Sequence, residues 1–419
     1  MATPSQPITA LAATGLAVLM LAFSPAGEAS AKPSLTRQFR AWIDKEIVPK
    51  ARRRGISKRV LKASLGGLTP DLSLPDLQQP GTKPGRRKDY SQSEFANPAR
   101  YFKEGGLNTY VKMGRQRLKK WAGELDRIER RYGVSKRILV AIWARESGFG
   151  RAAIPHNAFR ILATQAFMGH RKAMFVGELL AALEIVQRGD IGADRMKSSW
   201  AGALGQPQFM PSKFLKYAVD FDGDGRRDIW NSVPDTLASI AHFLKQHGWD
   251  GSRDWGFEAE VPRRVSCALE GPEQGRKVRD WAKRGVTRVA GREFPAAELA
   301  KTGYLMMPVG RYGPAFIATD NFYVIKSYNE SDAYALYIGH LADRLGRNRP
   351  FVASWRGLDH FSRGAVQRMQ ERLIRQGYDV GGADGLVGFK TRTAIGLWQE
   401  KHGMRPTCFP NAKLLKAVR

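Results

Sequence analysis

The chain has 419 residues, of which 43% are hydrophobic and 26% are charged. This length and composition exclude a single small domain and wholesale disorder, and predict two or more folded domains. With 68 Lys and Arg against 39 Asp and Glu, the formal net charge of +29 favours a polyanionic partner, which could be nucleic acid, anionic lipid or an anionic cell wall. The sequence has no helix-turn-helix, zinc-finger or aromatic-strand signature, so we do not expect nucleic acid to be the partner.

The chain begins with an apolar run at residues 8–23, followed by Ala29-Ser30-Ala31. The run is too short to span a bilayer comfortably, and an Ala-x-Ala ending is typical of a signal peptidase site. We therefore expect residues 1–31 to be a signal peptide cleaved after Ala31, which predicts a periplasmic protein with no stable membrane insertion. No Lys or Arg precedes the run, although signal peptides usually have one there, and an uncleaved anchor is the alternative. No cysteine lies near the cleavage point, so lipidation is not expected.

Helical periodicity dominates the chain from residue 39 to about residue 247. A loop rich in proline interrupts it at residues 66–93. The predicted helices are a pair within residues 39–65 and single helices at 101–132, 135–147, 161–167 and 175–188.

The helix predicted to begin at Ser135 carries the main candidate for catalysis. Ser135 is expected to cap its first turn, and Gly148 to end it. Glu146 lies one turn beyond Ile142 on the apolar face, so its carboxyl is expected to be buried and to keep its proton toward neutral pH. Such a group suits a general acid, although an ion pair with Arg145 is the simpler interpretation.

Other carboxyl groups are weaker candidates. Glu178 and Glu184 lie on a predicted helix where exposed or paired roles are expected, and Asp190 and Asp194 lie in a polar loop. The sequence therefore nominates one catalytic carboxyl, whereas ordinary glycosidases use two.

Two later segments contain further candidate residues. Residues 198–212 are rich in glycine and small side chains, which let a backbone approach a ligand closely, and include Ser199 and Gln208 as hydrogen-bonding groups. Residues 220–228 place Asp at loop positions one, three, five and nine and Gly at position six, as in a calcium-binding loop. Asn231 replaces the usual Glu at position twelve. A solvated turn is the alternative.

From residue 260 to residue 322, short apolar runs with Pro and Gly predict a small sheet-bearing lobe. A final helix is expected at residues 333–345, with Tyr328 and Asn329 at a strand-to-helix junction before it. Residues 346–357 form a short basic linker, followed by helical patterns around a turn at residues 383–388. Cys267 and Cys408 fall in different predicted domains, and their spacing leaves open a disulfide or two free thiols.

Three motifs together resemble the B-type lytic murein transglycosylases, which cleave peptidoglycan. They are Glu-Ser-Gly-Phe-Gly at residues 146–150, Ala-Gly-Ala-Leu-Gly-Gln-Pro-Gln-Phe-Met-Pro-Ser at 201–212 and Asp-Phe-Asp-Gly-Asp-Gly at 220–225. The resemblance runs from about Phe39 to Leu345. The last sixty residues resemble a peptidoglycan-binding domain, with Leu-x-x-x-Gly-Tyr at 373–378 and Asp-Gly-x-x-Gly at 384–388.

The resemblance implies an α+β, mainly α fold, in which residues 32–345 form a lysozyme-like helical catalytic domain with a small β-containing lobe and residues 358–419 form a helical wall-binding domain. It implies that Glu146 cleaves the bond between N-acetylmuramic acid and N-acetylglucosamine on glycan strands without a cofactor, leaving 1,6-anhydro ends. Residues implied to contact substrate are Ser199, Gln208, Tyr328, Asn329 and Tyr334, and those implied to hold a structural calcium are Asp220, Asp222, Asp224, Arg226 through its carbonyl, and Asp235.

Two adjacent positions depart from the family pattern, because His242-Phe243 stands where the family often has Asn-Tyr. This difference removes one phenol from the expected sugar-binding region. A hydrolytic muramidase and a non-catalytic wall-binding scaffold are the alternative functions.

Overall fold

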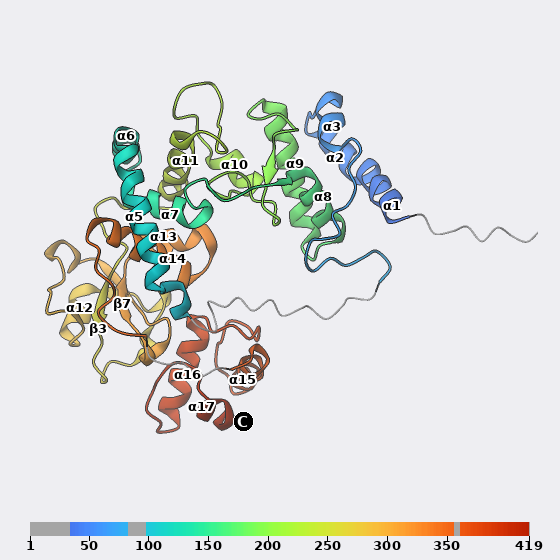
Figure 1. Ribbon diagram of the computed structural model, residues 1–419. Helices are drawn as coiled ribbons and strands as arrows, with labels where there is room; N and C mark the ends of the chain where they lie inside the picture. The colour runs from blue at the N-terminus through green and yellow to red at the C-terminus, as the bar shows by residue number, and fades with distance from the viewer. Residues whose placement is uncertain (1–33, 83–97, 356–360, 419) are drawn as a thin grey trace, which may run out of the picture.

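The computed structural model describes residues 34–82, 98–355 and 361–418, so the predicted signal peptide lies outside the described residues. Figure 1 shows a large helical region, a small sheet with α12 at the lower left, and a C-terminal helical domain at the bottom. The predicted α+β, mainly α class is confirmed. Within the described ranges, no helix has the length and apolarity needed to cross a membrane.

The first helices pack along one side of the helical region. Helix α1 (Leu35–Trp42) continues through a π-helical turn (Ile43–Ile47) into α2 (Val48–Arg53), and α3 (Lys58–Leu65) follows. Pro49 is the second residue of α2, close enough to the wider π-helical turn for that turn to accommodate a residue with no N–H to donate. The predicted pair of helices is confirmed, with an irregular turn inside the first.

The prediction of one helix over residues 101–132 is wrong. A 3-10 turn (Pro98–Phe102) is followed by α5 (Glu104–Lys120) and α6 (Ala122–Tyr132). Trp121 separates the two helices with a φ of −109° and a ψ of 29°, outside the helical range. Its ring packs partly against the main core, so tertiary packing decides a position that periodicity alone does not distinguish.

The centre of the helical region is α7 (Lys136–Ser147), whose residues from Ile138 to Ala144 are all buried. Six further helices and a two-stranded ladder complete this region around α7. They are α8 (Ala158–Met168), α9 (Lys172–Arg188), α10 (Pro211–Tyr217), α11 (Val233–Gln246), α13 (Asp320–Asn329) and α14 (Asp332–Gly346), with β1 (His156–Asn157) paired to β2 (Lys197–Ser198). Helix α14 packs along α7.

The predicted capping role of Ser135 is wrong. Ser135 occupies the position before α7, but its side chain makes no capping hydrogen bond. The Glu129 carboxylate instead accepts from the Lys136 N–H at 3.4 Å. A side chain of the preceding helix, α6, therefore accepts from one of the backbone N–H groups at the start of α7.

The predicted sheet-bearing lobe is confirmed and begins slightly earlier than expected. Its five antiparallel strands lie in the order β4 (Arg276–Lys277), β6 (Thr302–Met306), β7 (Ala315–Ala318), β3 (Gly256–Glu260) and β5 (Thr287–Arg288), with α12 (Val278–Lys283) beside them. Short 3-10 turns lie at Cys267–Leu269, Pro272–Gln274, Ala296–Glu298 and Gly310–Tyr312. The sheet has its own core around Trp281 and Ile317.

The expected strand-to-helix junction at Tyr328 and Asn329 is wrong. Both residues lie in the last turn of α13, so they precede a helix-to-helix turn. The Phe-Tyr-Val-Ile run that reads as strand is buried in a helix instead, because short apolar runs do not distinguish the two structures.

The C-terminal domain contains α15 (Arg363–Arg375), α16 (Phe389–Lys401) and α17 (Ala412–Ala417) around a third core. The described part of the preceding basic segment packs on the helical region. There, Phe351 and Trp355 lie against Phe102, with ring centroids 5.4 and 5.1 Å away.

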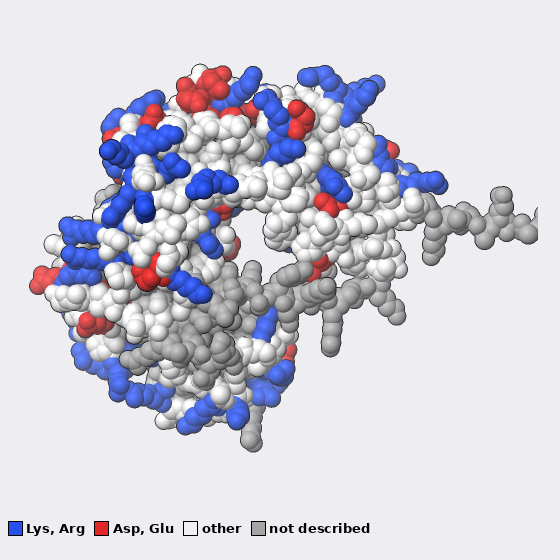
Figure 2. Space-filling model, viewed as in Figure 1, with Lys and Arg blue, Asp and Glu red and all other residues white. Residues whose placement is uncertain are grey.

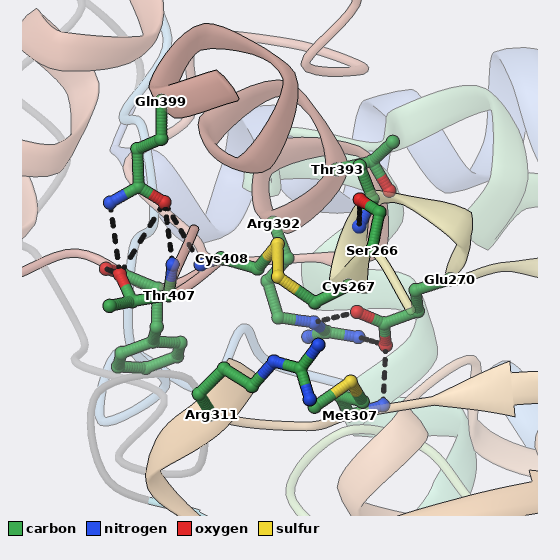
Figure 3. Close-up of a disulfide and its surroundings, with 12 residues drawn as sticks. Ser266, Cys267, Glu270, Met307, Arg311, Arg392, Thr393, Gln399, Thr407 and Cys408 are labelled. Carbon is green, nitrogen blue, oxygen red and sulfur yellow. Dashed lines mark hydrogen bonds and ion pairs between the residues drawn. A yellow bond between two sulfur atoms is a disulfide. The ribbon is translucent and has the colours of Figure 1, made fainter. Parts of the chain in front are cut away.

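A disulfide joins the sheet-bearing lobe to the C-terminal domain and settles the alternatives that the sequence left open. Cys267 and Cys408 are bonded, with their Cα atoms 6.1 Å apart. Figure 3 shows a buried ion pair beside it, in which Arg392 of α16 donates to both oxygens of Glu270 at 2.6 and 2.9 Å. The domain is thus fixed to the sheet by covalent and ionic contacts.

Positive charge is spread over the surface. On the face shown in Figure 2, Lys and Arg side chains occur over the helical region and the C-terminal domain, with smaller groups of Asp and Glu between them. The charge on this face is therefore not confined to one patch.

Candidate active site

The candidate acid lies where α7 ends. Gly148 and Gly150 adopt φ values of +55° and +76°, which end the helix as predicted. Glu146 is in the last turn and remains half-buried. The end of α7 thus holds one carboxyl at the edge of the main core.

Two tyrosines from α13 and α14 surround this carboxyl. The Tyr334 hydroxyl donates to Glu146 Oε1 at 2.6 Å. Tyr328 stacks on Tyr334, with centroids 6.2 Å apart and planes inclined by 9°, and its hydroxyl donates to the Pro207 carbonyl at 2.7 Å. The structure therefore brings together Glu146, Tyr328 and Tyr334, whereas Asn329 is exposed at the end of α13.

Burial raises the pKa of Glu146 to about 7, against the opposing effects of the Tyr334 hydrogen bond and of the cations Arg145 and Lys213. Both protonation states of this carboxyl are therefore accessible near neutral pH. A group with this property can donate a proton and take one back.

Lys213 is a neighbour of the site that sequence reasoning missed. Its ammonium donates to the Tyr328 carbonyl at 3.3 Å and lies 5.1 Å from the centroid of the Phe243 ring. Burial lowers its pKa. Phe243, where the chain departs from the family pattern, thus faces a lysine. No local sequence signal pairs Phe243 with Lys213, because the two residues belong to different helices.

The glycine-rich segment is held by its own side chains. Ser199 Oγ accepts from the Ala203 N–H at 3.2 Å, and Gln208, with a φ of +53°, donates from Nε2 to the Gly205 carbonyl at 2.9 Å. Since Tyr328 binds the Pro207 carbonyl next to Gln208, the segment is attached to the tyrosine pair.

Gln206, also missed, locks this segment to the end of α7. Its Oε1 accepts from the Trp143 indole N–H at 2.7 Å, and its Nε2 donates to the Trp230 carbonyl at 3.0 Å. A Cβ on Gly150 would lie 2.4 Å from Gln206 Oε1. The last glycine of the Glu-Ser-Gly-Phe-Gly motif therefore makes room for this amide.

Three of the four other carboxyls considered from the sequence have partners, and the fourth, Asp194, is exposed. Glu178 is buried and accepts from the Ser212 N–H and hydroxyl at 2.8 and 2.7 Å. Glu184 pairs with Arg188, and Asp190 with Arg227. These three carboxyls therefore perform structural roles.

The acidic loop gathers three carboxylates. Oxygen atoms of Asp220, Asp222 and Asp235 all lie within 4.8 Å of one another, a group that does not include Asp224. Asp235 is buried and accepts from the Phe221 and Asp228 N–H groups at 2.7 and 2.8 Å. Burial raises its pKa to about 6. Hard oxygen ligands at this spacing fit a cation such as calcium.

Comparison with known proteins gives two family matches. Residues 38–343 match the family described as "Transglycosylase SLT domain", and residues 362–418 match "Putative peptidoglycan binding domain". The chain is 31% identical over 230 residues to membrane-bound lytic murein transglycosylase B of Escherichia coli (strain K12). The aligned region covers 54% of this chain and 61% of that protein. The match thus spans less than two thirds of that relative.

Two solved structures are similar. SltB3 from Pseudomonas aeruginosa, in complex with NAG-anhNAM-pentapeptide, is 36% identical with a TM-score of 0.80, over 91% of this chain and 99% of that chain. Slt35 from Escherichia coli, in complex with calcium, is 23% identical with a TM-score of 0.57, over 75% and 93% of the two chains, and shares the fold.

Proposed function

Because this chain belongs to the Transglycosylase SLT domain family, we propose that it is a lytic murein transglycosylase that cleaves peptidoglycan between N-acetylmuramic acid and N-acetylglucosamine. The observation that carries this proposal is the half-buried Glu146, with a pKa of about 7 and one oxygen held by Tyr334. The complex of SltB3 with NAG-anhNAM-pentapeptide supports the same substrate class.

The reaction follows from this arrangement. Since Tyr334 donates to Oε1, Oε2 of Glu146 is free to carry the catalytic proton. Glu146 protonates the glycosidic oxygen, the bond to C1 of N-acetylmuramic acid breaks, and the 2-acetamido group stabilises the positive charge. The carboxylate then takes the proton of the 6-hydroxyl as that oxygen attacks C1, which closes a 1,6-anhydro ring and restores the acid. No water is consumed.

An internal hydroxyl can outcompete water because its effective concentration is high. A hydrolytic muramidase would need a base to activate water, and Glu178, Glu184 and Asp190 are engaged elsewhere. Tyr328, with Ser199 and Gln208 of the glycine-rich segment, would shape the sugar-binding surface beside Glu146. Asn329 and Tyr334 complete the proposed substrate contacts.

The remaining proposals concern location and wall binding. Residues 1–31 direct export to the periplasm, and residues 358–419 bind peptidoglycan and hold the catalytic domain at its substrate. The match of residues 362–418 to a peptidoglycan-binding family supports the second role, and the net charge of +29 suits an anionic wall.

Digestion of purified sacculi in heavy-oxygen water tests the reaction. We expect products that end in 1,6-anhydromuramic acid, weigh one water less than hydrolysis products and carry no label at the new end. Mass spectrometry measures both properties. One heavy oxygen atom per cleaved bond would instead identify a muramidase, and no cleavage at all would favour a scaffold.

A structural calcium ion is proposed at the acidic loop. Asp220, Asp222 and Asp235 would bind it through their carboxylates, with Asp224 and the Arg226 carbonyl as further ligands. The role of the ion would be structural, because it would fix the loop before α11. The proposed steps at Glu146 do not use a metal.

Calcium is therefore expected to raise the melting temperature by a few degrees at pH 8, because a ligand that binds only the folded state stabilises it. The shift should shrink as the pH falls through about 6, where Asp235 takes up a proton and competes with the cation. Thermal melts of chelator-treated protein with millimolar calcium measure this. Asp222→Asn should abolish the shift, and an equal shift in that variant would place the ion elsewhere.

A further inference from the structure

A buried cluster of charges connects the C-terminal domain to the turn between α13 and α14. Besides its two bonds to Glu270, Arg392 donates from Nη2 to Asp332 at 3.1 Å. Lys326 of α13 lies 2.8 Å from the other oxygen of Asp332. Arg392 and Glu270 are each 2% exposed, so these contacts are shielded from water.

Asp332 lies close in sequence to the tyrosine that holds the catalytic carboxyl. It is the first residue of α14, and Tyr334 follows in the same turn. Ser331, the residue before Asp332, accepts from the Tyr334 N–H at 3.3 Å. A displacement of Asp332 would therefore move the start of α14 and the ring of Tyr334 with it.

The other side of the turn is held by the same cluster. Lys326 lies in the last turns of α13, two residues before Tyr328, which stacks on Tyr334. Glu330 closes the turn with a φ of +60°, a conformation that an L side chain rarely adopts. Contacts from outside the turn are needed to maintain such a conformation.

We propose that Arg392, a residue of the C-terminal domain, is a positioning residue for cleavage: by holding Asp332 it fixes the α13–α14 turn and keeps Tyr334 against Glu146. The inference rests on the proposed function of Glu146. It assigns to the C-terminal domain a role in the reaction in addition to wall binding.

The position of Arg392 is itself fixed from two sides. The planar guanidinium matches the Glu270 carboxylate with two bonds, which leaves little freedom for the third bond to Asp332. The disulfide ties Cys267, three residues before Glu270, to Cys408 of the C-terminal domain. Stability alone does not require this arrangement, since apolar residues of similar volume often replace buried ion pairs without loss.

The test compares Arg392→Met with Lys390→Met, a matched loss of a cation on the same helix. Lys390 pairs on the surface with Asp379 and Glu273 and does not reach Asp332. With soluble glycan as substrate, we expect kcat to fall about tenfold in Arg392→Met, the size of effect that a small misplacement near the chemistry produces. Lys390→Met should retain the parent value. Equal kcat in the parent and in Arg392→Met would overturn the proposal.

A double-mutant cycle shows whether Arg392 acts through Tyr334. If it does, the double variant with Tyr334→Phe should be no slower than Tyr334→Phe alone, because the interaction that Arg392 supports is already absent. If the fold-losses in kcat of the two single variants multiply in the double variant, Arg392 does not act through Tyr334. If the parent chain itself does not cleave glycan, the proposed function fails, and the outcome is distinct from a failure of the positioning role.

The pH profile of kcat/KM separates positioning from a simple field effect. The groups around Glu146 are Tyr334, Tyr328, Arg145 and Lys213, and the Tyr334 bond lowers the pKa of the acid. Loosening this bond raises that pKa, so the alkaline limb of the profile should move to higher pH in both Arg392→Met and Asp332→Asn.

Asp332→Asn also serves if Arg392→Met folds poorly, because it leaves the Arg392–Glu270 pair in place. Removing a negative charge would by its field alone move the alkaline limb to lower pH. A shift to lower pH in Asp332→Asn, or no shift in either variant, would therefore overturn the proposal. Lys390→Met should keep the parent profile.

Discussion

Replacing Glu146 with Gln is expected to lower the rate of peptidoglycan cleavage by about a thousandfold, within the range that a general acid contributes. Gln keeps the volume of the side chain and can still accept from Tyr334, but it has no proton to deliver. Because both steps of the proposed reaction use the same carboxyl, neither can proceed. Release of soluble products from sacculi measures the loss.

The matched control for this variant is Glu184→Gln. Glu184 pairs with Arg188 on the surface of α9, so its loss should leave cleavage unchanged. Both variants should keep the parent melting temperature and bind sacculi as the parent does. Activity of the Glu146 variant within tenfold of the parent would refute its assignment as the acid.

Removing residues 358–419 is expected to destabilise the rest of the chain strongly. Glu270 would lose Arg392, its buried ion-pair partner, and breaking such a pair by removing one partner costs about 3–5 kcal/mol. The truncated chain also loses the disulfide across the interface. Urea unfolding followed by tryptophan fluorescence should show a transition at a clearly lower denaturant concentration.

Glu270→Gln in the truncated chain provides the control. This change removes the charge but keeps an oxygen to accept from the Met307 N–H, which Glu270 binds at 3.0 Å. It should recover a large part of the lost stability. A truncated chain as stable as the parent would show that the two domains fold independently, as a wall-binding tail on a free linker would.

Local patterns predicted the candidate acid because everything that defines it lies within one helix. The apolar stripe of α7, its terminal glycine and the position of Glu146 follow from helical periodicity. The partner Tyr334 lies 188 residues away in sequence, and only resemblance to known transglycosylases pointed to it. Periodicity also placed the sheet-bearing lobe, since β-strand patterns and turns are local.

Features that depend on distant segments could not be predicted. The bond between Arg392 and Glu270 joins residues 122 positions apart, and neither residue stands out within its own segment. The spacing of Cys267 and Cys408 likewise left their pairing open. Lys213 was missed because its surroundings are set by α10, α11 and α13 together. Local patterns also failed at two helix ends. At Trp121 core packing interrupts a helix that periodicity predicts to continue, and at Ser135 the Glu129 side chain, not Ser135, accepts from the first turn of α7.

The close approach of Gly150 to Gln206 limits which side chains the end of α7 accepts. The amide fills the space that any larger residue at Gly150 would occupy, while it holds the Trp143 indole on the helix of the acid. A larger residue at Gly150 would have to displace this amide from the Trp143 indole and also adopt a φ of +76°. The two motifs therefore form one packed unit, although they lie in separate parts of the chain.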